Sequence, residues 1–183
     1  DGQSNLGPRH NLRIIQTTAD ANFAHQDINV FSNHRLGATL VLNESQVFYD
    51  VGVRLVGKGS RHDFQSGYSV RFHAANKFLS VHRTIAIDHQ FLEEMLLLRL
   101  NNHAGGIPGL YNDAMWLIGP TDATTGIAML RLGGFGEVYL DGQFTNGNDF
   151  MLFEKEMTYR ATQTDDGTPE GRKLNNPTQH TFE

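Results

Sequence analysis

The sequence predicts a single α+β domain in which an antiparallel sheet, built from hairpins, packs against one helix. Three observations lead to this fold class. The chain of 183 residues is long enough for one domain with a substantial core and too short for two comfortable ones. Runs rich in β-branched and aromatic residues, separated by turn residues, dominate its first half. One stretch, at 91–100, consists almost entirely of good helix formers.

The predicted sheet contains a hairpin near its start. A β-rich run at 38–42 and another at 47–56 flank the turn residues 43–45. Within the second run, Gly52 and Arg54 alternate with apolar residues, which is the period of a half-buried strand. Further segments with strand character occur before and after the hairpin, at 11–17, 68–72, 81–87, 114–118, 126–132 and 150–159.

The helix predicted at 91–100 has defined ends. Asp88 is a suitable N-cap. The two consecutive glycines at 105 and 106 should end the helix, and Pro108 prevents it from resuming. Its apolar positions cover most of the helix circumference, so we expect it to be buried on more than one side. A shorter helix is expected within 135–144.

Composition restricts the classes of function. The chain has 15 Lys and Arg against 20 Asp and Glu, a formal net charge of −5 at pH 7. Nucleic-acid binding needs a basic face, so we expect no nucleic-acid partner. The absence of cysteine excludes disulfide scaffolds, cysteine zinc sites and thiol catalysis. No apolar run approaches the roughly 20 residues needed to cross a bilayer, so we expect no membrane span.

Two neighbouring motifs resemble a known family. The stretch 49–61, YDVGVRLVGKGSR, contains an Arg-x-x-Gly-x-x-Ser-Arg loop, and GYSVRF follows at 67–72. Together they resemble the signature of the CotH (spore-coat protein H) kinase-like family. Glu94 stands at the position of that family's helix glutamate, eleven residues before Gly105. The similarity includes 126–128 and 135–140 and extends over roughly 48–174.

The resemblance implies an architecture as well. It suggests a sheet with one key helix, like the small lobe of a protein kinase, followed by a hinge and the start of a larger lobe. The chain 1–183 would then be one CotH-like domain and a fragment of a longer protein. Its parts would be an N-terminal extension with the first strands at 1–46, the small lobe at 47–132 and the start of the second lobe at 133–183. The hinge would lie near Gly133 and Gly134.

The resemblance also implies a function. Members of this family are secreted or cell-surface proteins that transfer phosphoryl groups from ATP to protein, with Mg or Mn as the metal. A glycine-rich loop holds phosphate oxygens with its backbone N–H groups, and an ion pair between Arg71 and Glu94 would orient the phosphates. The implied partners are a nucleotide and a protein substrate or cell-surface partner. The expected cofactor-binding residues are Arg54, Gly57, Lys58, Gly59, Ser60, Arg61, Arg71 and Glu94.

Two departures from the family pattern leave a second function open. Family members usually carry a lysine just before the strand that begins at Tyr68, where this chain has Gln65, Ser66 and Gly67. Arg71 is the nearest basic residue, and an arginine fork is not equivalent to a lysine point charge. No metal-holding carboxylate motif follows, and the nine histidines lack metal-site spacing. We therefore expect transfer to be impaired or absent. The alternative is a non-catalytic structural, adhesive or carbohydrate-binding surface domain.

Overall fold

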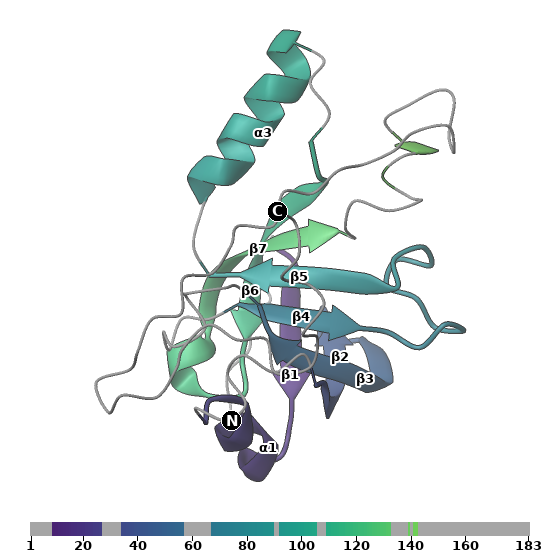
Figure 1. Ribbon diagram of the computed structural model, residues 1–183, viewed down its shortest axis with the longest axis vertical. Coiled ribbons are helices and arrows are strands. Elements are labelled where there is room, and N and C mark those ends of the chain that lie inside the picture. Colours follow the sequence, from purple (N-terminus) through teal and green to yellow (C-terminus); the bar gives the residue numbers. More distant parts are fainter. Residues whose placement is uncertain are drawn as a thin grey trace, which may run out of the picture.

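The computed structural model describes most of the first three quarters of the chain. Within this part, seven strands close into one barrel, and the helices α1 and α3 lie outside it (Figure 1). The described residues are 9–26, 34–56, 67–89, 92–105, 109–132, 139 and 141–142. The elements are β1 (Asn11–Ile15), α1 (Thr18–Ala24), β2 (Leu36–Leu42), β3 (Gln46–Leu55), β4 (Tyr68–Arg71), β5 (Thr84–Asp88), α3 (Leu92–Gly105), β6 (Asn112–Ile118), the 3₁₀ turn η2 (Asp122–Thr124) and β7 (Gly126–Leu132).

The strands follow one another around the barrel in the order β1-β2-β3-β4-β5-β7-β6. Every neighbouring pair is antiparallel except β1 and β6, which run parallel and close the barrel. Because side chains alternate along a strand, one set from each strand points inward and the other set covers the outer face. The inward sets of all seven strands form a single hydrophobic core.

Three phenylalanines, which we call the phenylalanine cluster, fill one part of this core. Phe48 belongs to β3, Phe72 directly follows β4, and Phe78 lies in the connection between β4 and β5. Their ring centroids are 5.0 to 5.9 Å apart, and Phe48 meets Phe72 edge to face, a favourable aromatic geometry. All three side chains are fully buried. They therefore support β3 and β4 from inside the barrel.

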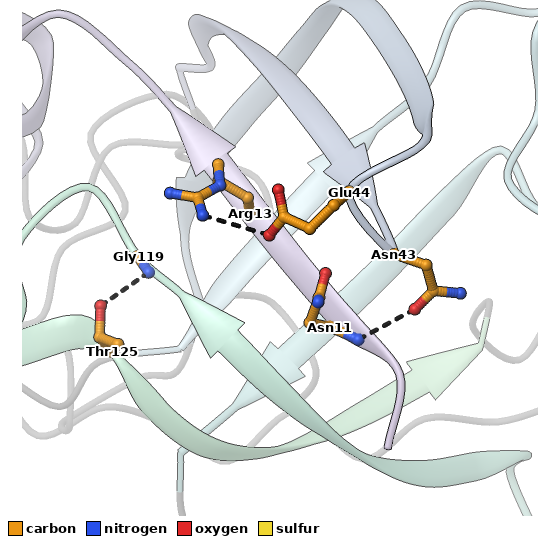
Figure 2. Close-up of polar contacts among 6 residues, drawn as sticks. All are labelled: Asn11, Arg13, Asn43, Glu44, Gly119 and Thr125. Atoms are coloured by element: carbon orange, nitrogen blue, oxygen red, sulfur yellow. Dashed lines mark hydrogen bonds and ion pairs between the residues drawn. The ribbon is translucent and has the colours of Figure 1, made fainter. Parts of the chain in front are cut away.

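Polar contacts secure β1 where the barrel closes (Figure 2). The turn after β2 reaches back to this strand. The backbone N–H of Asn11 donates to Asn43 Oδ1 at 3.1 Å, and Arg13 Nη2 forms an ion pair with Glu44 Oε1 at 3.1 Å. These contacts attach the turn to β1 in addition to the ladder of hydrogen bonds between β1 and β2.

The predicted architecture is wrong. The sequence suggests a sheet with one packed helix, like a protein-kinase small lobe, whereas the described residues form a closed mixed barrel. Closure depends on the parallel pairing of β1 with β6, which places Leu12 opposite Leu117. These residues are about a hundred positions apart in the sequence. Local alternation identifies a strand but not its distant partner, so the pattern could not show this pairing.

Helix α3 also differs from its prediction. It ends at Gly105 as predicted, but it begins at Leu92, and Asp88 is the last residue of β5 instead of the N-cap. The helix contacts β6 and β7. On the other side Leu96 and Leu97 are each 60% exposed. The expected burial on more than one side is therefore wrong.

Local patterns predicted most strands well. The strands expected at 38–42, 47–56, 68–72, 114–118 and 126–132 are confirmed to within two residues at each end. Helix α1 was not predicted from the sequence. No helix in the described ranges is long and apolar enough to cross a membrane. The expected loop residues 57–61, the hinge at 133–134 and the strand at 150–159 lie outside the described residues, and 135–144 is described only at 139, 141 and 142.

Candidate functional site

Two predicted arginines lie close together on the outer wall of the barrel. Val53 and Val70 point into the core, so Arg54 of β3 and Arg71 of β4 point outward. The register pairs Arg54 with Ser69 and Gly52 with Arg71. The two arginines are therefore diagonal neighbours across one strand pair, within reach of a common ligand.

A third arginine, Arg35, completes the cluster. It immediately precedes β2, and its guanidinium lies across β3 to reach β4. Arg35 Nη1 donates to the carbonyl oxygen of Gly52 at 3.2 Å and to that of Ser69 at 2.7 Å, while Nη2 donates to Ser69 Oγ at 3.0 Å. Ser69 is on the outer face, opposite Arg54, and is nevertheless buried where the Arg35 guanidinium reaches it. We call Arg35, Arg54 and Arg71 the arginine cluster.

Gly52 gives Arg35 the space to take this path. A β-carbon at Gly52 would lie only 3.1 Å from Cβ and 3.1 Å from Cδ of Arg35, closer than an ordinary van der Waals contact. A glycine inside a strand often marks such a close approach. Gly52 is therefore the sequence signal that could have indicated a side chain crossing β3, although it does not say that the side chain is Arg35.

The arginine cluster gathers three positive charges on one face of the barrel. Among the described residues, no carboxylate forms an ion pair with Arg35, Arg54 or Arg71. Burial, followed by the charges of Arg54 and Arg71, lowers the pKa of Arg35 to about 10. Burial, and then the charge of Arg71, also lowers the pKa of Arg54. A pKa near 10 still leaves Arg35 protonated at neutral pH, so this face is positively charged.

The predicted ion pair between Arg71 and Glu94 does not form. Glu94 Oε2 instead accepts a hydrogen bond from Arg131 Nη2 at 2.8 Å, and Asp88 Oδ2 lies 3.7 Å from the same nitrogen. Arg131 is on β7, which α3 contacts, whereas β5 separates β7 from the β4 strand of Arg71. Helix α3 thus places its glutamate beside a different strand from the one expected.

The structure brings together only part of the predicted site. Arg54 and Arg71 are neighbours, and Glu94 belongs to a separate ion pair. Gly57, Lys58, Gly59, Ser60 and Arg61 lie outside the described residues. Sequence reasoning missed Arg35 and Arg131, because each contacts a residue that is far away in the sequence: Ser69 for Arg35 and Glu94 for Arg131.

A groove elsewhere on the barrel offers different chemistry. It is lined by the end of β1 and the two residues after it, by β2 and by Asp50 of β3, and it contains this one carboxylate but no cation. It therefore does not suit a phosphate, and it includes none of the predicted site residues. Its lining consists of Ile15, Gln16, Thr17, Gly37, Ala38, Thr39 and Asp50.

Comparisons with known proteins do not assign a family to this chain. No family model matches it, and a search of curated proteins finds no significant match. In the part of the chain that the structure describes, no group of three or more His, Asp or Glu residues is placed to hold a metal ion. The physical features of the arginine cluster therefore provide the basis for a functional proposal.

Proposed function

We propose that this chain is a binding module for a phosphate-bearing ligand, which it holds on the arginine cluster. The observation that carries the proposal is the gathering of three guanidinium groups on one strand pair, with no paired carboxylate among the described residues. Guanidinium groups form strong, charge-assisted hydrogen bonds to phosphate oxygens. A bound phosphate would also relieve the mutual repulsion of Arg35, Arg54 and Arg71.

The three arginines would have different tasks. Arg35 uses its terminal nitrogens on Gly52 and Ser69, so it contributes charge and holds the wall in place. Arg54 uses only Nη1, which donates a hydrogen bond to the carbonyl oxygen of Leu55 at 3.1 Å. Arg71 is exposed and forms no hydrogen bond to the described residues. A guanidinium has five N–H donors. Arg54 and Arg71 thus retain donors for the ligand.

The resemblance to the CotH family suggests which phosphate ligand this is. It implies ATP, with Mg or Mn. It also assigns phosphate contacts to residues 57–61, which come two positions after the end of β3 in the sequence and three after Arg54. Our proposal concerns binding of the triphosphate. Phosphoryl transfer to a protein substrate is not part of it.

A titration of thermal stability tests the proposal. A ligand that binds only the folded state raises the melting temperature, and the rise continues with the logarithm of its concentration once this exceeds Kd. We expect pyrophosphate, and ATP with or without Mg or Mn, to raise the melting temperature of the full chain at constant ionic strength. Adenosine, which lacks phosphate, should leave it unchanged. A flat response to both phosphate ligands would overturn the proposal and favour the alternative of a structural or adhesive domain.

Matched arginine variants locate the binding site. Arg54→Gln and Arg71→Gln should each weaken pyrophosphate binding about tenfold, because each removes charge-assisted hydrogen bonds worth at least about 1.4 kcal/mol. Arg13→Gln is the control, since it removes the same charge from a different part of the wall, where Arg13 is paired with Glu44. Equal losses in all three variants would show attraction by net charge alone and would contradict a site at the arginine cluster.

A further inference from the structure

The connection between β4 and β5 presents two apolar side chains to solvent. Leu79 is 51% exposed and Val81 is 46% exposed, with the exposed Ser80 between them. Figure 1 shows this connection extending beyond the ends of the strands on one side of the barrel. We call Leu79 and Val81 the apolar tip. Single exposed apolar residues are common on protein surfaces, so the surroundings of the tip decide whether it has a function.

The apolar tip is anchored from inside the barrel. Phe78 and His82 stand on either side of it in the sequence, and both are buried. The backbone N–H of each donates a hydrogen bond of 2.9 Å to the carbonyl oxygen of the other, which closes a turn over residues 79–81. Phe78 also packs in the phenylalanine cluster. A fixed turn therefore holds the tip away from the core.

The backbone of this turn has a conformation that leucine rarely adopts. The angle φ is +49° at Leu79 and +64° at Ser80, in the left-handed region. Glycine enters this region without strain, whereas a bulky side chain is disfavoured there. The stability of the turn therefore does not explain why a leucine stands at this exposed position. Strained residues of this kind are concentrated at sites that contact ligands, which directs attention to a partner outside the barrel.

Basic side chains flank the apolar tip. Lys77 precedes Phe78 and Arg83 follows His82, and both cations are exposed. Neither forms an ion pair with a described residue. The stretch 67–87 contains no Asp or Glu, although the whole chain has a net charge of −5. The connection is therefore a basic region on an acidic protein.

We propose that the connection between β4 and β5 binds an anionic lipid surface. Lys77 and Arg83 would lie against the headgroups, and the apolar tip would enter the boundary between headgroups and acyl chains. The negative potential of such a surface attracts lysine and arginine, and apolar side chains gain free energy when they leave water. Peripheral membrane contacts combine these two contributions. A free anion would use only the cations and an apolar protein groove only the tip, whereas a lipid surface uses both.

This contact goes beyond the proposed phosphate site and can be separated from it. Arg71 of the arginine cluster lies at the base of the connection, but the apolar tip, Lys77 and Arg83 are not members of that cluster. Variants at these four positions therefore test lipid binding while Arg35, Arg54 and Arg71 stay unchanged.

Sedimentation of the full chain with lipid vesicles tests the proposal. We expect partitioning onto phosphatidylcholine vesicles with about 30% phosphatidylserine to be at least about tenfold stronger than onto phosphatidylcholine alone. Lys77→Gln and Arg83→Gln should each weaken it about fivefold, the usual effect of one basic residue near an anionic membrane. Arg13→Gln is the control, because it changes the net charge equally at a position paired with Glu44. An equal loss in Arg13→Gln, or no preference for phosphatidylserine, would overturn the proposal.

Substitutions in the apolar tip test its entry into the lipid. Leu79→Asn combined with Val81→Ser should weaken partitioning about tenfold without lowering the melting temperature, because both residues are exposed and asparagine tolerates the left-handed backbone. Ile127→Ser is the control. Ile127 is 41% exposed, and it lies on β7 beyond Met129, which pairs with the end of β5 that is remote from the connection. Unchanged partitioning of the tip variant would show attraction by charge alone and would overturn the proposal.

A fluorescent label gives a readout that does not depend on the strength of binding. The chain has no cysteine, so Leu79→Cys and Ile127→Cys each provide a single attachment site for an environment-sensitive dye. On phosphatidylserine vesicles, we expect the emission to shift to shorter wavelength at position 79 and to stay unchanged at position 127. Equal responses would contradict entry of the tip. Release of the protein by pyrophosphate at constant ionic strength would also overturn the proposal and assign the lipid to the arginine cluster.

Discussion

Two groups of arginines lie on the outer wall of one barrel, and they differ in what surrounds them. Arg131 on β7 has two carboxylates beside it, Glu94 at 2.8 Å and Asp88 at 3.7 Å. The arginine cluster on β3 and β4 has no paired carboxylate among the described residues. The neutralised arginine attaches α3 to the barrel. Without such a partner among the described residues, the arginines of the cluster repel each other and an anion would stabilise them, so the cluster is the candidate binding site.

The largest effect should come from the packing that supports the arginine cluster. Phe72 follows Arg71 directly, points into the barrel and contacts Phe48 and Phe78. Phe72→Ala should lower the unfolding free energy by about 3–5 kcal/mol, the usual cost of removing a buried phenyl ring. Urea denaturation measures this loss. Tyr49→Ala is the control, because Tyr49 is an aromatic residue on the same wall that is 72% exposed. Similar losses in both variants would show that the phenylalanine cluster does not support this wall.

The next effect separates the roles within the arginine cluster. Arg35→Met keeps much of the side-chain volume but removes the hydrogen bonds to Gly52 and Ser69, so we expect it to cost about 1–3 kcal/mol of unfolding free energy. Arg71→Met removes a charge without such bonds and should change stability by less than about 0.5 kcal/mol. Denaturation of both variants under the same conditions gives the comparison. A loss in Arg71→Met as large as that in Arg35→Met would contradict the assignment of Arg35 as the structural member.

A smaller effect is expected for the compensated arginine. Glu94→Gln removes the charge that pairs with Arg131, and both side chains are partly exposed, at 39% and 29%. Ion pairs in such settings contribute about 0–1 kcal/mol, so the loss of stability should fall in this range and diminish at high salt. Hydrogen exchange of the α3 amides should report it most directly. Glu93→Gln, on the exposed side of the same helical turn, should have no effect. An equal response in the two variants would mean that the ion pair does not attach the helix.

The sequence could predict what local patterns determine. Alternation separated Arg54 from the apolar residues of its strand, and the helix was located with its C-terminal end correct. It could not predict that Glu94 pairs with Arg131, or that Arg35 reaches Ser69, because both contacts depend on the order of strands around the barrel. That order follows from closure by β1 and β6, a pairing between distant segments that no local pattern contains.

The smallest effect is expected for the pH dependence of stability, to which two histidines contribute. Burial lowers the pKa of His82, near the phenylalanine cluster, below its ordinary value of 6.5. Burial also lowers the pKa of His89, beside Asp88, but the charge of Asp88 and a hydrogen bond to the Thr124 backbone oppose that shift. In each case the unfolded chain binds the proton more readily, so stability is complete above about pH 6.5 and is lost as the pH falls below it.

The melting temperature should therefore fall between about pH 7.5 and pH 5.5, the range around the ordinary histidine pKa. His82→Gln and His89→Gln should each reduce this fall, because each removes a histidine whose pKa is lowered by burial. Thermal denaturation at several pH values measures both slopes. If His82→Gln keeps the full pH dependence of the unsubstituted chain, His82 is not a source of acid sensitivity.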